Sequence, residues 1–452
     1  MTTYYNLKLV TTITSAAIDS VVLNLDLGCT DYIPAAAPIE NSAATTGYID
    51  GGTQQFARWR NRQEEIKIKF NDVATYEEAE RVLNTAHLRA ENVATPRLYL
   101  YAQRIGDADF WRSRLYTARL TPSDGMGGFL KSGSPFMGTL EIERDYYWER
   151  AAVEQIIFDD PVGVGWVPTR SIINDWSFAA PAPTAPIAKV TRVLIEGTLP
   201  APLDLFFKNT GTIGVDHISR IHIGHNWRSD PVNFEPRLGG VIAPAPITGS
   251  AEQGLYSVAI AAPAASTMRG SWFRLLLATS NNLPADTLFS IEIEDTWGVL
   301  LYKSPQVAIW YGGQTLIDVG SVPLPPAPIP LPAVFNLRIT IQVPSNAGTI
   351  SVDRGVFLMP ADSYRMLIGQ PGSNLKAADT LSDLQSIDAP PYAVQNFFGT
   401  SYYPLTPHYG KVWLMPGRHN ALYFMATDAV DAMDTGITYD VSGQYRPRRL
   451  TI

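Results

Sequence analysis

The chain has 452 residues, enough for about three domains of about 150 residues each. Its 35 Lys plus Arg and 43 Asp plus Glu give a net charge of −8, which argues against a general nucleic-acid binder. Charged residues make up 17% of the chain, against about 25% in a typical soluble domain. We therefore expect much of the surface to be buried in cores or against partners.

The single cysteine, Cys29, excludes a framework of intramolecular disulfides and a zinc finger. The N-terminus has neither the basic nor the apolar region of a secretory signal. There is no apolar run of about 18 residues, so the sequence predicts no membrane span. These features predict a soluble, β-rich, multidomain protein made in a reducing compartment.

Residues 1–150 begin with strand-like patterns. Leu23–Leu27 alternates apolar and polar residues, which indicates a strand with one face in a core. Residues 30–53 are rich in Ala, Pro, Ser, Thr and Gly and are long for a connector, so we interpret them as an interaction arm or a mobile loop. In the next strand, Ile66, Ile68 and Phe70 alternate with charged residues.

A single amphipathic helix is predicted over residues 75–93. Thr75 precedes Glu78 by three residues, which is the spacing of a capping box. Ala79 and Leu83 recur at helical intervals and predict the buried face. Further strands follow at 97–102, 111–120 and 136–143.

The rest of the chain divides by composition. Residues 151–187 end in a Pro- and Ala-rich tract and predict a semi-rigid linker. A second β unit begins at Ala188, and a third begins near Gly254. The third unit contains seven or more short strand-like runs, which is typical of a jelly-roll sandwich.

Three histidines, His217, His222 and His225, are the clearest candidates for metal ligands. Along an extended strand, however, positions 222 and 225 point to opposite faces, so we favour surface or partner-facing histidines and expect no metal site. The acidic run Ile291–Asp295 has the carboxylates of a glycosidase, but its alternation favours a strand with a solvated polar face.

Three aromatic residues near this run, Trp297, Trp310 and Tyr311, could stack on sugars or form sandwich core. The sequence contains no nucleophile elbow and no phosphate- or dinucleotide-binding loop. We therefore expect no enzyme, no catalytic residues and no cofactor.

Two arginine clusters lie near the two ends of the chain. Arginine is favoured at interfaces, where its planar guanidinium pairs with carboxylates, although solvated surface charge is the alternative. In an acidic protein such clusters suit self-association. The predicted subunit-interface residues are Arg58, Arg60, Arg62, Arg446, Arg448 and Arg449.

Several segments follow one another in a characteristic order. They are Arg58–Arg62 before Ile66–Phe70, Thr75–Glu80 at the start of the helix, Leu98–Tyr101, Gly138–Arg144 with Tyr147–Glu149, Leu414–Phe424, and Gln444–Arg448. This order resembles that of phage distal tail proteins. The resemblance is firm over residues 1–150 and looser over 188–228 and 411–449.

The resemblance implies a mainly β fold. A tail-tube-like β-barrel or sheet with one packed α-helix would be followed by a galectin-like β-sandwich carrying an inserted jelly-roll sandwich. The expected parts are a ring domain at 1–150, a linker at 151–187, a split second sandwich at 188–234 plus 405–452, an inserted carbohydrate-binding-like jelly roll at 235–368, and a loop region at 369–404.

The resemblance also implies a structural virion protein of the phage tail tip or baseplate. Such a protein forms a ring, expected to be a hexamer, that joins the tail tube protein to the tail hub or tip proteins. It would assemble in the bacterial host cytoplasm, and DNA would contact it only by passing through the lumen. The outward sandwich would bind host surface polysaccharide. The alternatives are a stand-alone carbohydrate-binding protein and a glycan-active enzyme.

Overall fold

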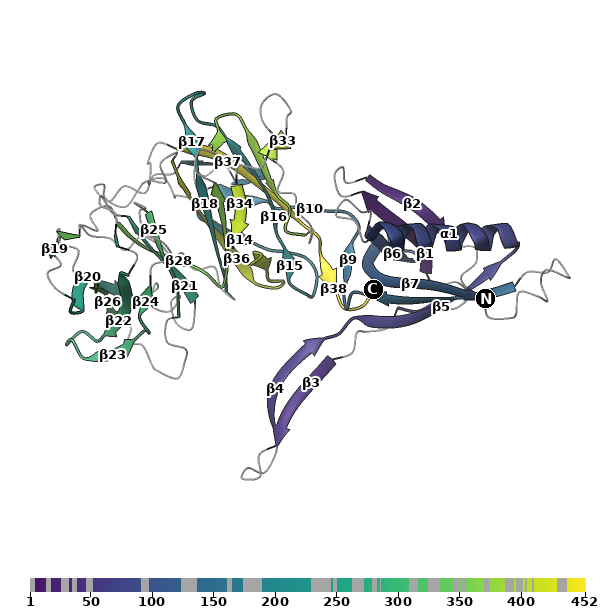
Figure 1. The fold of residues 1–452 in the computed structure, drawn as a ribbon, viewed down its shortest axis with the longest axis horizontal. Helices are drawn as coiled ribbons and strands as arrows, with labels where there is room; N and C mark the ends of the chain where they lie inside the picture. The colour runs from purple at the N-terminus through teal and green to yellow at the C-terminus, as the bar shows by residue number, and fades with distance from the viewer. Residues whose placement is uncertain are drawn as a thin grey trace. The chain divides into compact units, whose positions relative to one another are not determined.

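The chain folds mainly as β-structure, in two compact units (Figure 1). In this computed structural model, unit 1 comprises Met1–Glu154, Glu196–Leu199 and Arg446–Ile452, and unit 2 comprises Gln155–Ile195 and Pro200–Tyr445. The structure describes residues 5–13, 18–25, 32–34, 39–45, 52–90, 97–122, 136–160, 165–173, 189–228, 245–246, 250–261, 272–278, 283–284, 286–308, 316–323, 334–344, 349–350, 355–369, 374–386, 394–395, 401–402, 405–408, 410–428 and 437–452.

An antiparallel sheet with strand order β2-β1-β6-β7-β8-β5 forms the body of unit 1, and two short strands extend it, because β9 pairs with β7 and β38 pairs with β9. The predicted alternation of the fifth strand is confirmed, since Ile66, Ile68 and Phe70 are buried. The strands are β1 (Tyr5–Ile13), β2 (Ile18–Asn24), β5 (Arg62–Phe70), β6 (Arg97–Arg104), β7 (Trp111–Pro122), β8 (Phe136–Arg144), β9 (Trp148–Arg150) and β38 (Arg448–Arg449).

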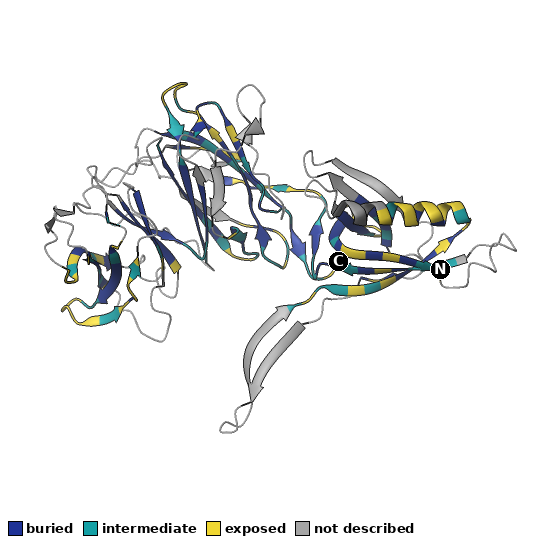
Figure 2. Cartoon of the chain, viewed as in Figure 1, coloured by how far each residue is buried: buried dark blue, intermediate teal, exposed yellow. Residues whose placement is uncertain are grey.

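One helix, α1 (Val73–Ala90), packs on this sheet. It buries Ala79 and Leu83, as the sequence predicts, and also Tyr76, whose ring packs edge-on against Phe70 with the centroids 5.3 Å apart. Figure 2 shows the opposite face of the helix exposed to solvent. Within the described residues, no helix is long and apolar enough to cross a membrane.

The helix begins two residues before the predicted start, and the capping-box prediction is wrong. Asp72 is the N-cap, because its Oδ1 accepts hydrogen bonds from both the amide and the hydroxyl of Thr75, each at 2.7 Å. Glu78 pairs instead with Arg81, whose Nε donates to it at 2.8 Å. The side chain of Asp72 therefore accepts the Thr75 amide hydrogen, which the Glu78 carboxylate accepts in a capping box.

Two strands replace most of the loop expected at residues 30–53. β3 (Ile39–Thr45) and β4 (Gly52–Trp59) form an antiparallel hairpin. Within the described residues they pair only with each other, and β4 leads directly into β5 of the main sheet (Figure 1). The sequence did not predict this pairing, because neither strand shows sustained apolar–polar alternation.

Unit 2 contains a sandwich whose two sheets share one core. Phe207 of one sheet and Phe424 of the other meet edge-on, with ring centroids 6.0 Å apart. The first sheet is β14 (Lys189–Val193), β36 (His419–Thr427), β18 (Arg220–Arg228), β29 (Ser363–Gly369) and β34 (Leu405–His408). The second sheet is β10 (Glu154–Gln155), β37 (Thr438–Tyr445), β16 (Asp204–Asn209), β31 (Thr380–Asp383), β32 (Val394–Gln395), β33 (Ser401–Tyr402) and β13 (Thr169–Ile173).

Two segments expected to lack strands contribute strands to unit 2. The expected linker, residues 151–187, supplies β13, which pairs with β37, and its Pro-rich end lies outside the described residues. The expected loop region, residues 369–404, supplies β31, which pairs with β16. These strands are short, and each is held by a partner far away in the sequence, so local patterns gave no signal.

A second pair of sheets in unit 2 has its own core, which includes Leu275, Phe289, Ile291, Phe335 and Leu337. The last strand of the range expected for the inserted jelly roll, β29, belongs instead to the first sandwich. One sheet is β20 (Gln253–Ala261), β26 (Val334–Gln342), β22 (Leu288–Glu294), β23 (Leu300–Lys303) and β24 (Val307–Ala308), and the other is β25 (Leu316–Pro323), β21 (Trp272–Ala278) and β28 (Gly355–Pro360).

The remaining strands form short two-stranded pairs. They are β11 (Phe158–Asp160) with β12 (Gly165–Val167), β15 (Ala201–Pro202) with β35 (Trp413–Leu414), β17 (His217–Ile218) with β30 (Leu375–Lys376), and β19 (Ala245–Pro246) with β27 (Thr349–Ile350).

Candidate functional site

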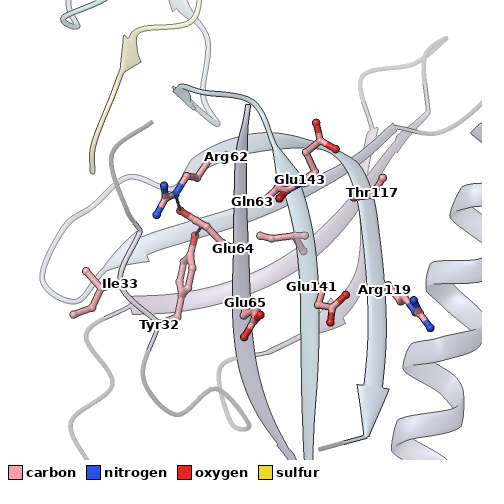
Figure 3. Close-up of a pocket in the computed structure, with 11 residues that line it drawn as sticks. Tyr32, Ile33, Arg62, Gln63, Glu64, Glu65, Thr117, Arg119, Glu141 and Glu143 are labelled. Carbon is pink, nitrogen blue, oxygen red and sulfur yellow. Dashed lines mark hydrogen bonds and ion pairs between the residues drawn. The ribbon is translucent and has the colours of Figure 1, made fainter. Parts of the chain in front are cut away.

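A hollow of about 880 Å³ lies over β5, β8 and β7 of unit 1, beside the segment 32–34 (Figure 3). On β5 and β8 the lining residues Gln63, Glu65, Glu141 and Glu143 alternate with the core-facing positions, whereas Glu64 lies on the same face of β5 as the buried Ile66. The lining residues are Tyr32, Ile33, Arg62, Gln63, Glu64, Glu65, Thr117, Arg119, Glu141, Ile142 and Glu143.

At one side of the hollow, the lining residue Glu64 forms a buried ion pair with Arg144 and holds a tyrosine. The guanidinium of Arg144 donates to Glu64 through Nη2 at 2.8 Å and through Nε at 3.1 Å. The Tyr32 hydroxyl donates to Glu64 Oε2 at 2.5 Å. Burial, together with the negative charge of Glu64, raises the pKa of Tyr32 well above its ordinary value, so the hydroxyl stays a donor. These bonds fix residues 32–34, which precede the hairpin in the sequence.

The open side of the hollow is a row of carboxylates. Glu65 on β5 lies directly opposite Glu141 on β8, and Arg119 on β7 lies opposite Glu141 on its other side. Like charges in directly opposed positions repel, and Arg119 offsets part of that repulsion. Glu143 accepts a hydrogen bond from Asn61 at 3.3 Å. The surface can therefore take cationic or hydrogen-bonding groups from a partner.

The N-terminal arginine cluster lies at the root of the hairpin and the rim of the hollow. Arg58 is the penultimate residue of β4, and its side chain lies outside what the structure describes. Arg60 is exposed in the turn between β4 and β5. Arg62 lines the hollow, with its Nε 3.8 Å from Glu64. The predicted interface residues of this cluster thus lie beside one another, next to the hairpin.

The C-terminal arginine cluster makes contacts inside unit 1. Arg448 is only 5% exposed, pairs with Glu149 at 3.2 Å and stacks on the Tyr147 ring at 4.0 Å. Arg446 donates to the backbone carbonyl of Arg150 at 3.2 Å, and Arg449 lies 4.6 Å from the Trp111 ring centroid. A guanidinium buried as deeply as that of Arg448 offers no surface to another subunit, which corrects the interface prediction for this residue.

The histidines are core residues of unit 2, which corrects the prediction of surface or partner-facing side chains for His222 and His225. Both are fully buried. His222 Nδ1 bonds the Tyr364 hydroxyl at 2.6 Å. His217 is half-buried on β17. Among the described residues no group of His, Cys, Asp and Glu side chains could hold a metal ion.

His225 sits in a hydrogen-bond network that needs its neutral form. Asn420 Oδ1 accepts the Met415 amide and also bonds His225 Nε2 at 3.0 Å, so Nε2 is the donor. Nδ1 then accepts from the Ser363 hydroxyl at 2.8 Å. Burial lowers the pKa of His225 to about 4.

Of the predicted sugar-stacking residues, Trp297 is described and is 87% exposed. It occupies a turn in which Asp295 Oδ1 accepts the amides of Trp297 and Val299, each at 2.8 Å, and Gly298 takes a positive φ of 83°. Trp310 and Tyr311 lie outside the described residues. Trp297 is therefore held at a rigid turn and contributes nothing to the core.

The acidic run beside it forms the predicted strand, but the prediction of a solvated polar face is wrong for Glu292, which is buried. Ile291 and Ile293 are fully buried, and Glu292 pairs with Lys303 at 3.0 Å across the sheet. Asp295 is committed to the turn. These carboxylates thus stabilise the strand and the turn.

No family model matches the chain, and no curated protein matches it. Solved structures of phage tail components do match it. The SPP1 Dit protein (gp 19.1), described as a hub adsorption apparatus of phages infecting Gram-positive hosts, is 9% identical, with 99% of each chain covered and a TM-score of 0.29. A chain of the phage P2 baseplate in its activated conformation with Ca is 11% identical, with 100% of each chain covered and a TM-score of 0.31.

A second chain of the phage p2 baseplate, from a structure with Sr, is 12% identical and has a TM-score of 0.24. The match covers 74% of this chain and 97% of that chain. TM-scores at this level do not establish a common fold, so we base the proposed function on this chain's own residues.

The Tyr32 anchor can be tested by removing one oxygen. Tyr32→Phe leaves a buried carboxylate oxygen of Glu64 with one donor fewer, and we expect a loss of about 1.5–3 kcal/mol in the free energy of unfolding. Tyr439→Phe is the control, because the buried Tyr439 hydroxyl has no hydrogen-bond partner among the described residues, so the same substitution there should cost at most about 0.5 kcal/mol. Equal losses in urea unfolding of the two variants would contradict the anchoring role.

His225 predicts acid sensitivity of unit 2. The unfolded chain binds a proton below pH 6.5, whereas the folded chain excludes it down to about pH 4. Stability should therefore fall between those two values by up to about 3 kcal/mol. Urea midpoints at pH 7 and pH 4.5 should differ less in His225→Gln than in the unsubstituted protein, while His217→Gln keeps the full difference. An unchanged difference in His225→Gln would remove His225 as the cause.

Proposed function

We propose that the chain is a structural protein of a phage tail tip, located in the virion tail, that forms a ring through unit 1. The observation that carries the proposal is the hairpin β3–β4, which pairs with no other described strand. An isolated two-stranded hairpin is at best marginally stable in water. Its strands contain only three large apolar residues, Ile39, Phe56 and Trp59, so a neighbouring subunit is the natural source of its missing contacts.

The main sheet of unit 1 supports the same proposal. Its outer strands β2 and β5 have no described partner on their outer edges, and open edges attract further strands. Lys67 and Lys69 are exposed on β5, and lysines on an edge strand disfavour unspecific pairing with other strands. The row Glu65 and Glu141 lies on the same sheet. Contacts between two different surfaces of one subunit close into a ring when the rotation closes.

The finer parts of the proposal follow from the resemblance in the sequence. The ring is a hexamer that joins the tail tube protein to the hub or tip proteins, and it assembles in the cytoplasm of the bacterial host. DNA meets it only in the lumen. The ring domain, the split sandwich and the inserted sandwich have the roles that the resemblance implies, with the inserted sandwich facing a host surface.

The ring is tested by the mass of the purified chain and by negative-stain images. We expect a closed ring of about six copies, held by contacts between unlike surfaces. Replacing residues 39–59 by a short Gly-Ser linker should leave monomers, because the hairpin contacts are lost. The control is Ile213→Ser, an exposed apolar position of unit 2, which should assemble normally. A monodisperse monomer of the unsubstituted chain at all concentrations, or rings without the hairpin, would overturn the proposal.

A second function, binding of host surface polysaccharide, is favoured by one observation. Trp297 presents its ring to solvent on a turn that is already fixed by hydrogen bonds, so little entropy is lost when a sugar stacks on it. Aromatic faces are suited to the apolar faces of pyranose rings. Among the described residues, the neighbouring carboxylates Glu292 and Asp295 are engaged in the strand and the turn, so the exposed ring fits binding better than hydrolysis.

Sugar binding is tested on an immobilised host polysaccharide. Trp297→Ala should reduce retention at least about tenfold, since one stacking contact of about 1.4 kcal/mol corresponds to that factor. The matched control is Trp272→Ala, because Trp272 is 52% exposed on a different sheet of the same sandwich. Equal retention of both variants and the unsubstituted chain would exclude Trp297 as the sugar platform.

A further inference from the structure

Unit 1 is built from three separate stretches of sequence, Met1–Glu154, Glu196–Leu199 and Arg446–Ile452. Apart from residues 196–199, everything between residues 154 and 446 belongs to unit 2. The last stretch of unit 1 is therefore synthesised after the whole of unit 2. In most multidomain chains an N-terminal domain folds as a unit before the next domain has been made.

The last stretch completes the sheet of unit 1. In β38, Arg448 pairs with Glu149 of β9 and Arg449 pairs with Trp148. The Arg150 amide donates to the Pro447 carbonyl at 2.9 Å. The amides of Thr198 and Leu199 both donate to the Arg448 carbonyl, at 2.7 and 3.1 Å. Without residues 446–452, β9 would keep only β7 as a neighbour.

The same stretch completes a buried charge cluster. Glu149 Oε1 accepts from Arg112 Nε at 3.0 Å, and Glu149 Oε2 accepts from Arg448 Nη2 at 3.2 Å. Burial opposes ionisation of Glu149, but Arg112 and Arg448 together hold its pKa below the ordinary value. Arg448 also stacks on Tyr147. A buried carboxylate that loses one of its two cations is strongly destabilised.

A further contact ties the first strand of unit 1 to its last stretch. The Tyr5 hydroxyl donates to the Ile452 carbonyl at 3.0 Å, and the Ile452 side chain packs against the core of unit 1. Residues 446–452 thus contact β1 and β9, which flank β6 and β7 in the sheet.

We propose that residues 446–452 form a closing clamp, so that unit 1 reaches its assembly-competent form only after unit 2 has been synthesised. The part that concerns assembly rests on the proposed function. Before closure, β9 is unpaired on one side and Glu149 lacks a cation, so the contacts that hold the sheet rigid are incomplete. Nascent N-terminal segments of different chains could associate through their open sheet edges before unit 2 has been made. Late closure of the clamp delays this association and therefore delays ring formation.

A substitution at Gly197, which lies against the backbone of Arg448, tests the clamp. Gly197 has φ of +109°, and a Cβ there would lie 2.6 Å from the Arg448 carbonyl oxygen, so Gly197→Ala should displace β38. Gly214→Ala is the matched control, because Gly214 also has a positive φ, +81°, but a Cβ there meets nothing within 4 Å. Arg448→Ala is a second variant that removes the cation and leaves the backbone intact, with Arg104→Ala, at an exposed arginine of β6, as its control.

Amide hydrogen exchange gives the readout that does not depend on ring formation. In Gly197→Ala and Arg448→Ala the amides of β9 and β7 should exchange at least about tenfold faster, with β18 and β36 of unit 2 unchanged. Both controls should exchange as the unsubstituted chain does. Unchanged protection of β9 in both clamp variants would overturn the clamp. If the unsubstituted chain forms no ring, the proposed function fails, and hydrogen exchange still decides the clamp.

The order of folding can be tested on ribosome-stalled chains that carry a flexible C-terminal extension. Chains stalled with residues 1–440 or 1–452 outside the ribosome should differ in the protease resistance of unit 1, because only the longer chain contains Arg448. Arg448→Ala in the longer chain should restore the sensitivity. Equal resistance of the two lengths would show that unit 1 closes without the clamp and would overturn the proposal.

Discussion

The carboxylate of Glu149 lies between two guanidinium groups, and the integrity of unit 1 depends on this contact. Arg112 comes from the adjacent strand β7, whereas Arg448 lies 299 residues after Glu149 in the sequence. Each arginine also stacks on a tyrosine, with Arg112 4.5 Å from the ring centroid of Tyr99. Because a buried charge without its partner is far more costly than a buried pair, the cluster is satisfied only when distant parts of the chain are correctly placed.

Buried arginine–carboxylate pairs also recur in the other cores. Arg274 binds Asp318 at 2.6 and 2.9 Å, and Arg365 binds Asp383 at 2.7 and 2.6 Å. In each pair both guanidinium donors meet both carboxylate oxygens, which fixes the geometry as well as the charge. Strands in which every second side chain is apolar can slip by two residues without exposing the core. A slipped register would leave these charges buried and unpaired, so the pairs select one register.

The sequence could predict what local periodicity determines. The alternation of Ile66, Ile68 and Phe70 and the helical spacing of Ala79 and Leu83 identified buried faces correctly, because burial on one side of an element leaves a direct pattern. The mainly β character followed from the same patterns. Of the arginines near residue 60, Arg62 lines the hollow, and the interface role predicted for Arg58, Arg60 and Arg62 stays a prediction.

The β3–β4 hairpin and the Asp72 N-cap are local features that the sequence did not predict, but the other missed features depend on partners distant in the chain. From the sequence alone Arg448 is interpreted as surface charge, but in the structure it pairs with Glu149. His225 is likewise interpreted as a surface residue, but in the structure it bonds Asn420 and Ser363. Tyr32 lies in a stretch without periodicity, and only Glu64 and Arg144 reveal it as an anchor.

These anchors explain how a weakly apolar hairpin can serve a structural role. Tyr32 fixes the chain before β3, and the continuous backbone from β4 into β5 fixes it after the hairpin. A hairpin held at both roots loses less conformational entropy when a neighbouring subunit covers it than a free loop of the same length would lose. β5, which follows the hairpin, belongs to the main sheet of unit 1, and β38 extends the same sheet. Closure of unit 1 and anchoring of the hairpin therefore rest on two buried polar clusters of the same unit, one around Glu149 and one around Glu64.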